Sequence, residues 1–192
     1  MEGVLTPEIW IAFAEESGIP ELKRTTRDEP DYDKLMNYRL DILREHGLGL
    51  KEIQDTISKI DPLPGAKEFL DRLREKTQVI ILSDTFTQFA QPLIKKMGYP
   101  TIFCNELVVS GSGEITDFRM RCEKSKLTTV KCLQAMGFET IAAGDSFNDL
   151  GMIEASKAGF LFRSTEQLKK DYPMYKALET FDELYDEIIA VL

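Results

Sequence analysis

The spacing of hydrophobic residues divides this chain into two parts. Over the first sixty residues the apolar positions recur every three to four residues, which is the spacing of one helix face. Three helices are predicted there: the first begins at Pro7 with Thr6 as its N-cap, and the others cover approximately 35–47 and 51–60. A polar, irregular segment is predicted over 25–30. The front of the chain is therefore predicted to be almost entirely helical.

From residue 64 onward, helical and strand patterns alternate. The predicted order is a helix to about 76, strand 79–82, helix 86–97, a strand near 102, a hairpin over 107–120 that turns at 111–113, helix 126–136, strand 140–143, helix 148–155, strand 159–162 and helix 181–191. Strands that alternate with helices indicate a parallel sheet with helices on both faces. The predicted fold class is therefore α/β, and the helical front block is expected to form a cap beside the sheet.

The composition is informative mainly because it excludes several kinds of protein and partner. The chain has 192 residues, 43% of them hydrophobic, which suits one α/β domain with a modest insertion. Its formal net charge is −9, so nucleic acid and anionic membranes are not expected as partners. The sequence has no apolar run near the ~18 residues of a membrane span, and no basic leader. Its three cysteines, Cys104, Cys122 and Cys132, form no CxxC pair, so a reduced, cytoplasmic setting is predicted.

The single histidine, His46, argues against one class of mechanism. Gly144-Asp145-Ser146 has the order found at the start of some serine hydrolases, but that chemistry needs a histidine base later in the chain. His46 instead lies directly before Gly47, where a helix C-cap favours a cation. We therefore expect His46 to cap a helix.

Polar side chains gather where predicted strands end. Asp145 and Asp149 lie in one tight turn after an apolar strand, and hard oxygen ligands at the carboxyl end of a parallel strand are typical of a Mg²⁺ site. Ser83 follows the buried strand 79–82, where its hydroxyl can bind a phosphate oxygen. Lys126 opens a helix, where a cation opposes the helix dipole, so an anion nearby is expected. Taken alone, Lys126 would sooner be interpreted as a solvated surface residue.

In chain order, Glu2-Gly3-Val4-Leu5, Ser83, Lys126 and the segment from Gly144 to Asp149 resemble the four motifs of the haloacid dehalogenase-like phosphohydrolases. The resemblance covers nearly the whole chain. With Glu2 at the second acidic position of the first motif, and with the segments 4–10 and 82–86, the chain looks most similar to the bifunctional phosphoserine phosphatase and homoserine phosphotransferase subgroup.

The resemblance also implies a domain organisation. A Rossmann-like parallel sheet would be formed by residues 1–6 and 64–192, and residues 7–63 would form the small helical cap of the phosphoserine phosphatase branch. In this family the first motif begins with a nucleophilic aspartate, which here would precede Met1. We therefore expect Met1 to be an internal methionine of a longer sequence. Because a central strand would be missing, costing roughly 5 to 9 kcal/mol of apolar burial, the 192-residue chain is expected to be inactive and poorly folded.

For the intact form, the resemblance implies an aspartyl-phosphate mechanism. Mg²⁺ would be held by the nucleophilic aspartate, Asp145 and the backbone carbonyl of Glu2, and would neutralise the phosphoryl oxygens. Ser83 and Lys126 would bind the remaining oxygens. Glu2 would be the general acid and then the base, which requires a raised pKa. Asp149 would orient Lys126 or a metal-bound water.

Substrate choice is expected to depend on the cap. The resemblance implies that Glu8 binds the ammonium and Arg39 the carboxylate of phosphoserine, a small-molecule phosphomonoester, with Asp84 and Asn148 also at the substrate site. Arginine suits this role because its planar guanidinium grips a carboxylate with two hydrogen bonds. Without the resemblance, Glu8 would be read as a helix-dipole partner and Arg39 as a solvated residue.

Three alternatives stay open at this point. The protein could hydrolyse another small phosphomonoester, or it could be a regulatory pseudoenzyme that lacks the nucleophile. A non-catalytic nucleotide- or signal-binding module is a third possibility, against which stands the absence of a GxGxxG or GxxxxGK[ST] loop from the sequence.

Overall fold

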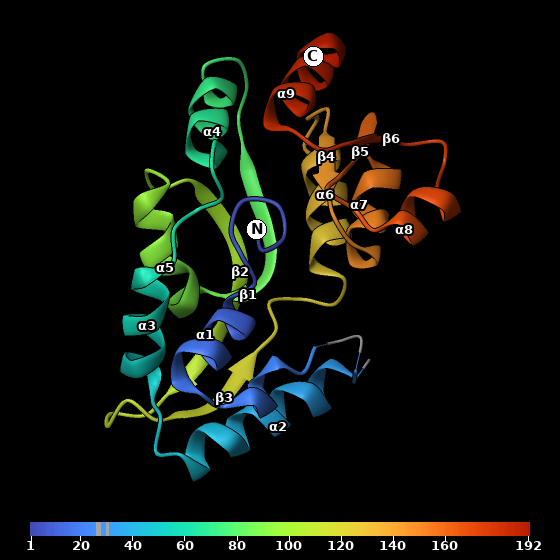
Figure 1. Ribbon diagram of the computed structural model, residues 1–192. Helices are drawn as coiled ribbons and strands as arrows, with labels where there is room; N and C mark the ends of the chain where they lie inside the picture. The colour runs from blue at the N-terminus through green and yellow to red at the C-terminus, as the bar shows by residue number, and fades with distance from the viewer. Residues whose placement is uncertain (26–27, 30) are drawn as a thin grey trace.

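The structure is a computed structural model that describes residues 1–25, 28–29 and 31–192 (Figure 1). The helices are α1 (Ile9–Ser17), α2 (Tyr32–Glu45), α3 (Leu50–Lys59), α4 (Ala66–Arg74), α5 (Thr87–Lys96), α6 (Ser125–Ala135), α7 (Leu150–Ala155), α8 (Glu166–Asp171) and α9 (Phe181–Val191), with short 3-10 helices η1 (Pro20–Lys23) and η2 (Phe147–Asp149). The strands are β1 (Ile80–Phe86), β2 (Thr101–Val109), β3 (Ile115–Arg119), β4 (Ile141–Gly144), β5 (Ala158–Phe162) and β6 (Lys176–Leu178). The irregular segment predicted over 25–30 lies partly outside the described residues.

The strands form two sheets of three, in the orders β1-β2-β3 and β4-β5-β6. β1 pairs with β2 in parallel, β2 and β3 form the predicted antiparallel hairpin, and β4, β5 and β6 are all parallel. The α/β prediction with a parallel sheet core is confirmed. The sheet is nevertheless divided, because within the described residues no strand is hydrogen-bonded to both β1 and β4.

A cavity of about 540 Å³ lies between the two sheets. Its walls are formed by residues 79–82 at β1 and 141–144 at β4, and it is closed further by apolar side chains of α4, α6 and α9. Figure 1 shows β1 and β4 on opposite sides of this region, with the N-terminus beside it. We call this space the interstrand cavity. Both of its walls are strand edges, and within the described ranges no strand pairs with their outer backbone groups.

Two hydrophobic cores stabilise the fold. The larger core joins the helices of the front block to β1, β2 and α5, where the Trp10 and Phe89 rings meet edge to face at 5.3 Å, and it extends to Phe160 and Phe162 of β5. The smaller core surrounds β4, β5 and α7, with Leu161 and Ile153 at its centre. Helices link the halves: α4 packs on α9 through stacked rings of Phe69 and Phe181, and α6 contacts both β1 and α7.

The N-terminal helix starts later than predicted, so the assignment of Thr6 as its N-cap is wrong. The backbone of Thr6 is already used in a tight loop, since its N–H bonds to the Met1 carbonyl at 3.2 Å and its carbonyl accepts from Gly3 at 2.9 Å. Glu8 occupies the N-cap position instead, and α1 begins at Ile9.

Other differences are smaller. β1 continues past the predicted strand to Phe86, with an irregular register after Leu82. The predicted helix over 148–155 is divided into η2 and α7, and η1, α8 and β6 were not predicted. His46 is the C-cap of α2, which confirms its predicted role.

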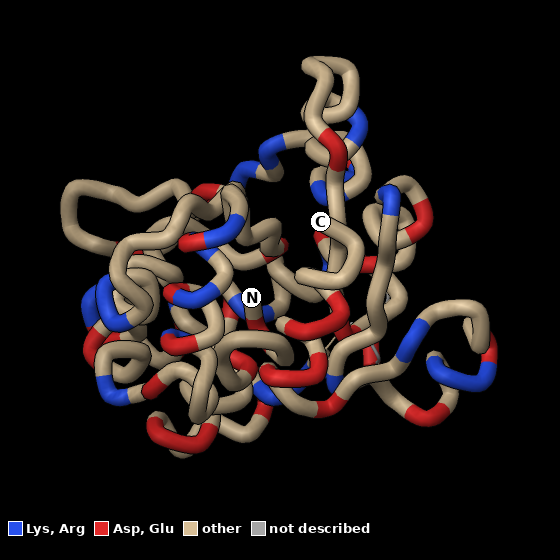
Figure 2. Tube along the Cα trace, turned by 90° about the horizontal axis from the view of Figure 1, so that it is seen from above, with Lys and Arg blue, Asp and Glu red and all other residues tan. Residues whose placement is uncertain are grey.

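The remaining predictions from the sequence concern the cysteines, membrane-spanning helices and the distribution of charge. The three cysteines are free thiols, and Cys104 is buried. Across the described ranges, every helix is too short or too polar to cross a membrane. Figure 2 shows acidic and basic residues intermixed along the chain.

Candidate active site

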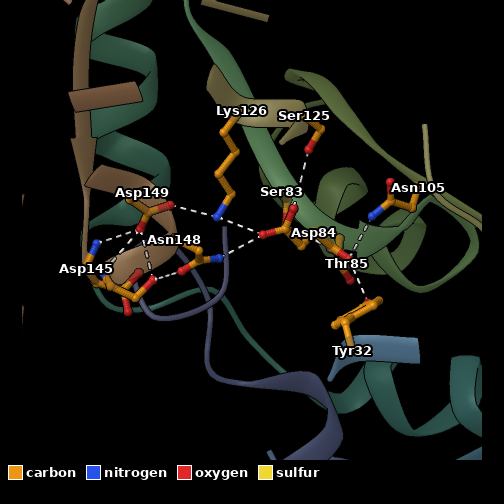
Figure 3. A network of polar contacts seen from close by, with 11 residues as sticks. Tyr32, Ser83, Asp84, Thr85, Asn105, Ser125, Lys126, Asp145, Asn148 and Asp149 are labelled. Carbon is orange, nitrogen blue, oxygen red and sulfur yellow. Dashed lines mark hydrogen bonds and ion pairs between the residues drawn. The ribbon is translucent and has the colours of Figure 1, made fainter. Parts of the chain in front are cut away.

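Lys126 lies at the start of α6 with its ammonium held between two carboxylates (Figure 3). Its Nζ is 2.7 Å from Asp149 Oδ1 and 3.0 Å from Asp84 Oδ2. Burial alone would lower the pKa of Lys126, but the charges of Asp149 and Asp84 outweigh it and raise that pKa. The prediction that Lys126 has anions nearby is therefore confirmed, and these anions belong to the protein. Its side chain is only 11% exposed, which excludes the solvated alternative.

The acidic turn after β4 is organised by Asp149. One oxygen of this carboxylate binds Lys126, and the other accepts the backbone N–H groups of Asp145 at 3.0 Å and Ser146 at 3.2 Å. These contacts keep the pKa of Asp149 low in spite of its burial. Gly144 allows the approach, because a Cβ there would lie 2.4 Å from the Asp149 Cβ.

Asp145 points away from this network toward the N-terminal loop. A Cβ on Gly3 would lie 2.5 Å from Asp145 Oδ2, so the loop backbone passes directly over the carboxylate. Burial, and then the charge of Asp149, raise the pKa of Asp145. A cation beside this carboxylate would relieve both effects, and hard oxygen is the donor that Mg²⁺ prefers.

Glu2 is turned toward the N-terminus of α1. Its Oε2 accepts the N–H of Ile9 at 2.9 Å, which places the carboxylate on one of the free donors of the helix. Burial raises the pKa of Glu2, more than the Ile9 hydrogen bond lowers it. The general-acid role predicted for Glu2 requires a pKa raised in this direction. Among the described residues, no three acidic, histidine or cysteine side chains converge on one metal position.

Residues 83–85, which continue β1 beyond its apolar part, connect α2 to Lys126. Ser83 is buried, and its hydroxyl accepts the N–H of Thr85 at 3.3 Å. The carbonyl of Asp84 accepts the hydroxyl of Tyr32 at 3.2 Å and the amide of Asn105 at 3.0 Å. Figure 3 shows Asp84 at the centre of these contacts, between α2, β2 and the start of α6.

Arg39 is a buried cation of α2 that forms no salt bridge within the described part of the chain. Its guanidinium lies 4.5 Å from the centre of the Trp10 ring, and its Nη2 donates to the Arg24 carbonyl at 2.7 Å. Its Nε has no hydrogen-bond partner. Burial lowers the pKa of Arg39 to about 10, partly offset by the charges of Tyr32, Glu2 and Glu8. This burial excludes the reading of Arg39 as a solvated residue.

Residues 6–157 match the haloacid dehalogenase-like hydrolase family, a segment that contains Ser83, Lys126, Asp145 and Asp149. The chain belongs to this family.

Curated relatives of this haloacid dehalogenase-like hydrolase agree with the match. A phosphoserine phosphatase of Pseudomonas syringae pv. tomato is 48% identical, over 98% of this chain and 80% of the relative. The protein named phosphoserine phosphatase ThrH of Pseudomonas aeruginosa is 47% identical, over 98% of this chain and 92% of the relative. Among solved structures, a substrate-bound phosphoserine phosphatase has a TM-score of 0.77 and 22% identity, over 98% of this chain and 93% of that one. The last comparison supports the fold alone.

In this haloacid dehalogenase-like hydrolase, the site residues predicted from the sequence thus lie in two groups. Asp84, Lys126, Asn148 and Asp149 form one network, and Asp145 lies beside it. Arg39 lies on α2, where the charges of Glu2 and Glu8 act on it, and Glu8 itself is exposed.

Sequence reasoning missed Tyr32 and Asn105, which hold the backbone of Asp84. Tyr32 also lies near Arg39, whose charge acts on its hydroxyl, while burial raises the pKa of Tyr32. Neither residue stands at a strand end or in a motif, so no signal in the sequence marks it.

Proposed function

We propose that this hydrolase is a Mg²⁺-dependent phosphatase of O-phospho-L-serine, working through an aspartyl-phosphate. The observation that carries the proposal is the buried guanidinium of Arg39, which has no anionic partner of its own among the described residues. Burying an unpaired charge is unfavourable, and a ligand carboxylate would remove that cost. Phosphoserine has such a carboxylate, and the two relatives that share almost half of their residues with this chain are named as phosphoserine phosphatases.

The phosphoryl group would bind at the network around Lys126. Lys126, at the start of α6, provides a cation, and the buried Ser83 of β1 provides a hydroxyl. In the same site, Arg39 would bind the amino acid carboxylate and Glu8 the ammonium. Glu2 would protonate the serine oxygen as it leaves and would then take a proton from the attacking water.

Asp145 and the Glu2 backbone carbonyl are the groups of this chain that fit Mg²⁺, because both offer hard oxygen donors. In addition, burial and the charge of Asp149 disfavour the ionised form of Asp145, and a bound cation would offset this cost. The ion would supply neutralisation of the phosphoryl oxygens. Asp149 would take no direct part, since its oxygens are used by Lys126 and by backbone N–H groups.

For the nucleophile, we propose an aspartate directly before Met1, at the end of a strand that occupies the interstrand cavity. Two features support this. The cavity has strand edges on both sides and an apolar lining that suits a buried parallel strand. The Met1 nitrogen is buried, and burial and the charge of Lys126 lower its pKa, while Asp149, Glu2 and Asp145 raise it. A residue joined to Met1 would therefore lie among the candidate site residues.

The test compares the 192-residue protein with a version extended by a short apolar strand that ends in Asp. We expect only the extended protein to release phosphate from phosphoserine, and only with Mg²⁺. An extension that ends in Asn is the matched control, because it fills the cavity without supplying a nucleophile. Equal activity of the 192-residue protein would contradict the proposed nucleophile, and two folded but inert proteins would favour a binding role.

A second test addresses the substrate. Arg39→Ala in the active protein should lower kcat/KM for phosphoserine about 100-fold, the loss expected for two charge-assisted hydrogen bonds of about 1.5 kcal/mol each. Turnover of an aryl phosphate, which has no carboxylate to bind, should change little. Arg72→Ala, which removes an exposed arginine paired with Asp182, is the control. Unchanged phosphoserine turnover in Arg39→Ala would indicate another small phosphomonoester.

We also propose homoserine as an alternative acceptor of the phosphoryl group. The support is the resemblance of the Glu2 motif to the bifunctional subgroup and the 47% identity to the relative named ThrH. Adding homoserine to the phosphoserine reaction should yield phosphohomoserine at the expense of free phosphate, and its absence would restrict the acceptor to water.

A further inference from the structure

The two carboxylates that hold Lys126 differ in how firmly they are fixed. Asp149 is 6% exposed, and both of its oxygens are occupied by Lys126 and by the turn after β4. Asp84 is 35% exposed. Within the part of the chain that the structure describes, its carboxylate is held by side chains alone: Lys126 at 3.0 Å, Asn148 at 2.8 Å and, more weakly, Ser125 at 3.4 Å. The position of Asp149 is thus fixed by the protein backbone, whereas another anion could replace the Asp84 carboxylate at Lys126.

The donors that hold Asp84 are those that a phosphoryl group would need. Lys126 Nζ and Asn148 Nδ2 both point at Asp84 Oδ2 (Figure 3). A carboxylate offers no hydrogen of its own to a phosphate dianion, and two anions that share one set of donors repel each other. Asp84 and a phosphoryl group therefore compete for the same two side chains.

We propose that Asp84 is an internal counter-ion, which occupies the donors of the phosphate site until a phosphoryl group displaces it. It is a positioning residue: it holds Lys126 and Asn148 in place while the site is empty. The inference rests on the proposed function only in taking phosphate as the anion, and it does not depend on the nucleophile or on phosphoserine.

The backbone of Asp84 is suited to this exchange. Its carbonyl is fixed by Tyr32 from α2 and by Asn105 from β2, at 3.2 and 3.0 Å. A rotation of the side chain alone would therefore release Lys126 without moving the strand. Because the carboxylate remains close by, its charge opposes a bound phosphate and so limits how tightly the product is held.

The test is phosphate binding by the 192-residue protein and by its Asp84→Asn variant, measured by isothermal titration calorimetry with inorganic phosphate in the presence of MgCl₂. Asparagine keeps the size of the side chain and one oxygen for Lys126 and Asn148, but removes the charge. We expect Asp84→Asn to bind phosphate about tenfold more tightly, as one opposing charge at close range would predict. Thermal unfolding would verify that both proteins are folded, and Asp84→Ser provides a second uncharged variant.

Asp71→Asn is the matched control, since Asp71 is an exposed carboxylate paired with Lys67 on α4. It should leave phosphate affinity unchanged. Equal or weaker binding by the folded Asp84 variants would overturn the proposal and leave Asp84 as a structural bridge. So would a lack of phosphate binding by all of these proteins. A failure to hydrolyse phosphoserine would not affect this result, because the titration uses inorganic phosphate and needs no turnover.

Discussion

At the scale of single residues, the site depends on how closely backbone and carboxylates approach one another. Gly144 and Gly3 each place backbone where a Cβ would collide with an aspartate, Asp149 in the first case and Asp145 in the second. The N–H groups of the turn reach Asp149 because Gly144 has no side chain. Small residues at these positions are therefore as necessary to the charge arrangement as the acids themselves.

Gly144→Ala should therefore reduce the free energy of unfolding by about 1–3 kcal/mol, the usual cost of forcing extra atoms into a packed site. Gly151→Ala in helix α7 is the control, because its new Cβ would make an ordinary 3.5 Å contact with Leu127 of α6. It should stabilise the protein by about 0.5–1 kcal/mol. Urea denaturation measures both changes, and equal effects of the two variants would contradict the close-approach argument.

Much of the network could be predicted from position alone. Asp145 follows the apolar strand β4, Ser83 follows the apolar part of β1, and Lys126 opens a helix, so the ends of apolar segments indicate where the polar groups converge. The environment of Arg39 could not be predicted, because its burial against Trp10 depends on how two helices pack. The functional roles given to these residues stay predictions until the variants are measured.

At the scale of elements, the long periodic helices were predicted most closely, and α9 was predicted at its observed bounds. Short elements such as α8 and β6 carry too few residues for a periodic pattern. Strand order cannot be read from periodicity either, so the division of the sheet between β1 and β4 came only from the structure. The boundaries of the proposed cap, 7–63, stay a prediction.

The divided sheet predicts an exchange pattern. β5 is paired on both sides at Phe160 and Leu161, whereas β1 and β4 each have an edge on the interstrand cavity. In the 192-residue protein, amides of β1 and β4 should therefore exchange with deuterium faster than those of β5. In the extended protein this difference should disappear, since the added strand would pair with both edges. Equal protection of these three strands in the 192-residue protein would contradict the division.

At the scale of the whole molecule, attraction of an anionic substrate must be local. The net charge of −9 opposes an approaching phosphomonoester at long range, although salt screens this beyond about 8 Å at physiological ionic strength. Acidic and basic residues are intermixed along the chain (Figure 2), so the buried cations Lys126 and Arg39 have to provide the selectivity at short range.

The interstrand cavity also has a consequence for the order in which the chain folds. Its two walls begin at residues 80 and 141, which lie far apart in the chain. Contacts between such distant segments form late, because closing the intervening loop costs entropy before any contact compensates for it. We expect the more local contacts on each side of the cavity to form first. The site would then be the last part of the molecule to assemble, so that a nascent chain acquires its chemistry only when the two halves meet.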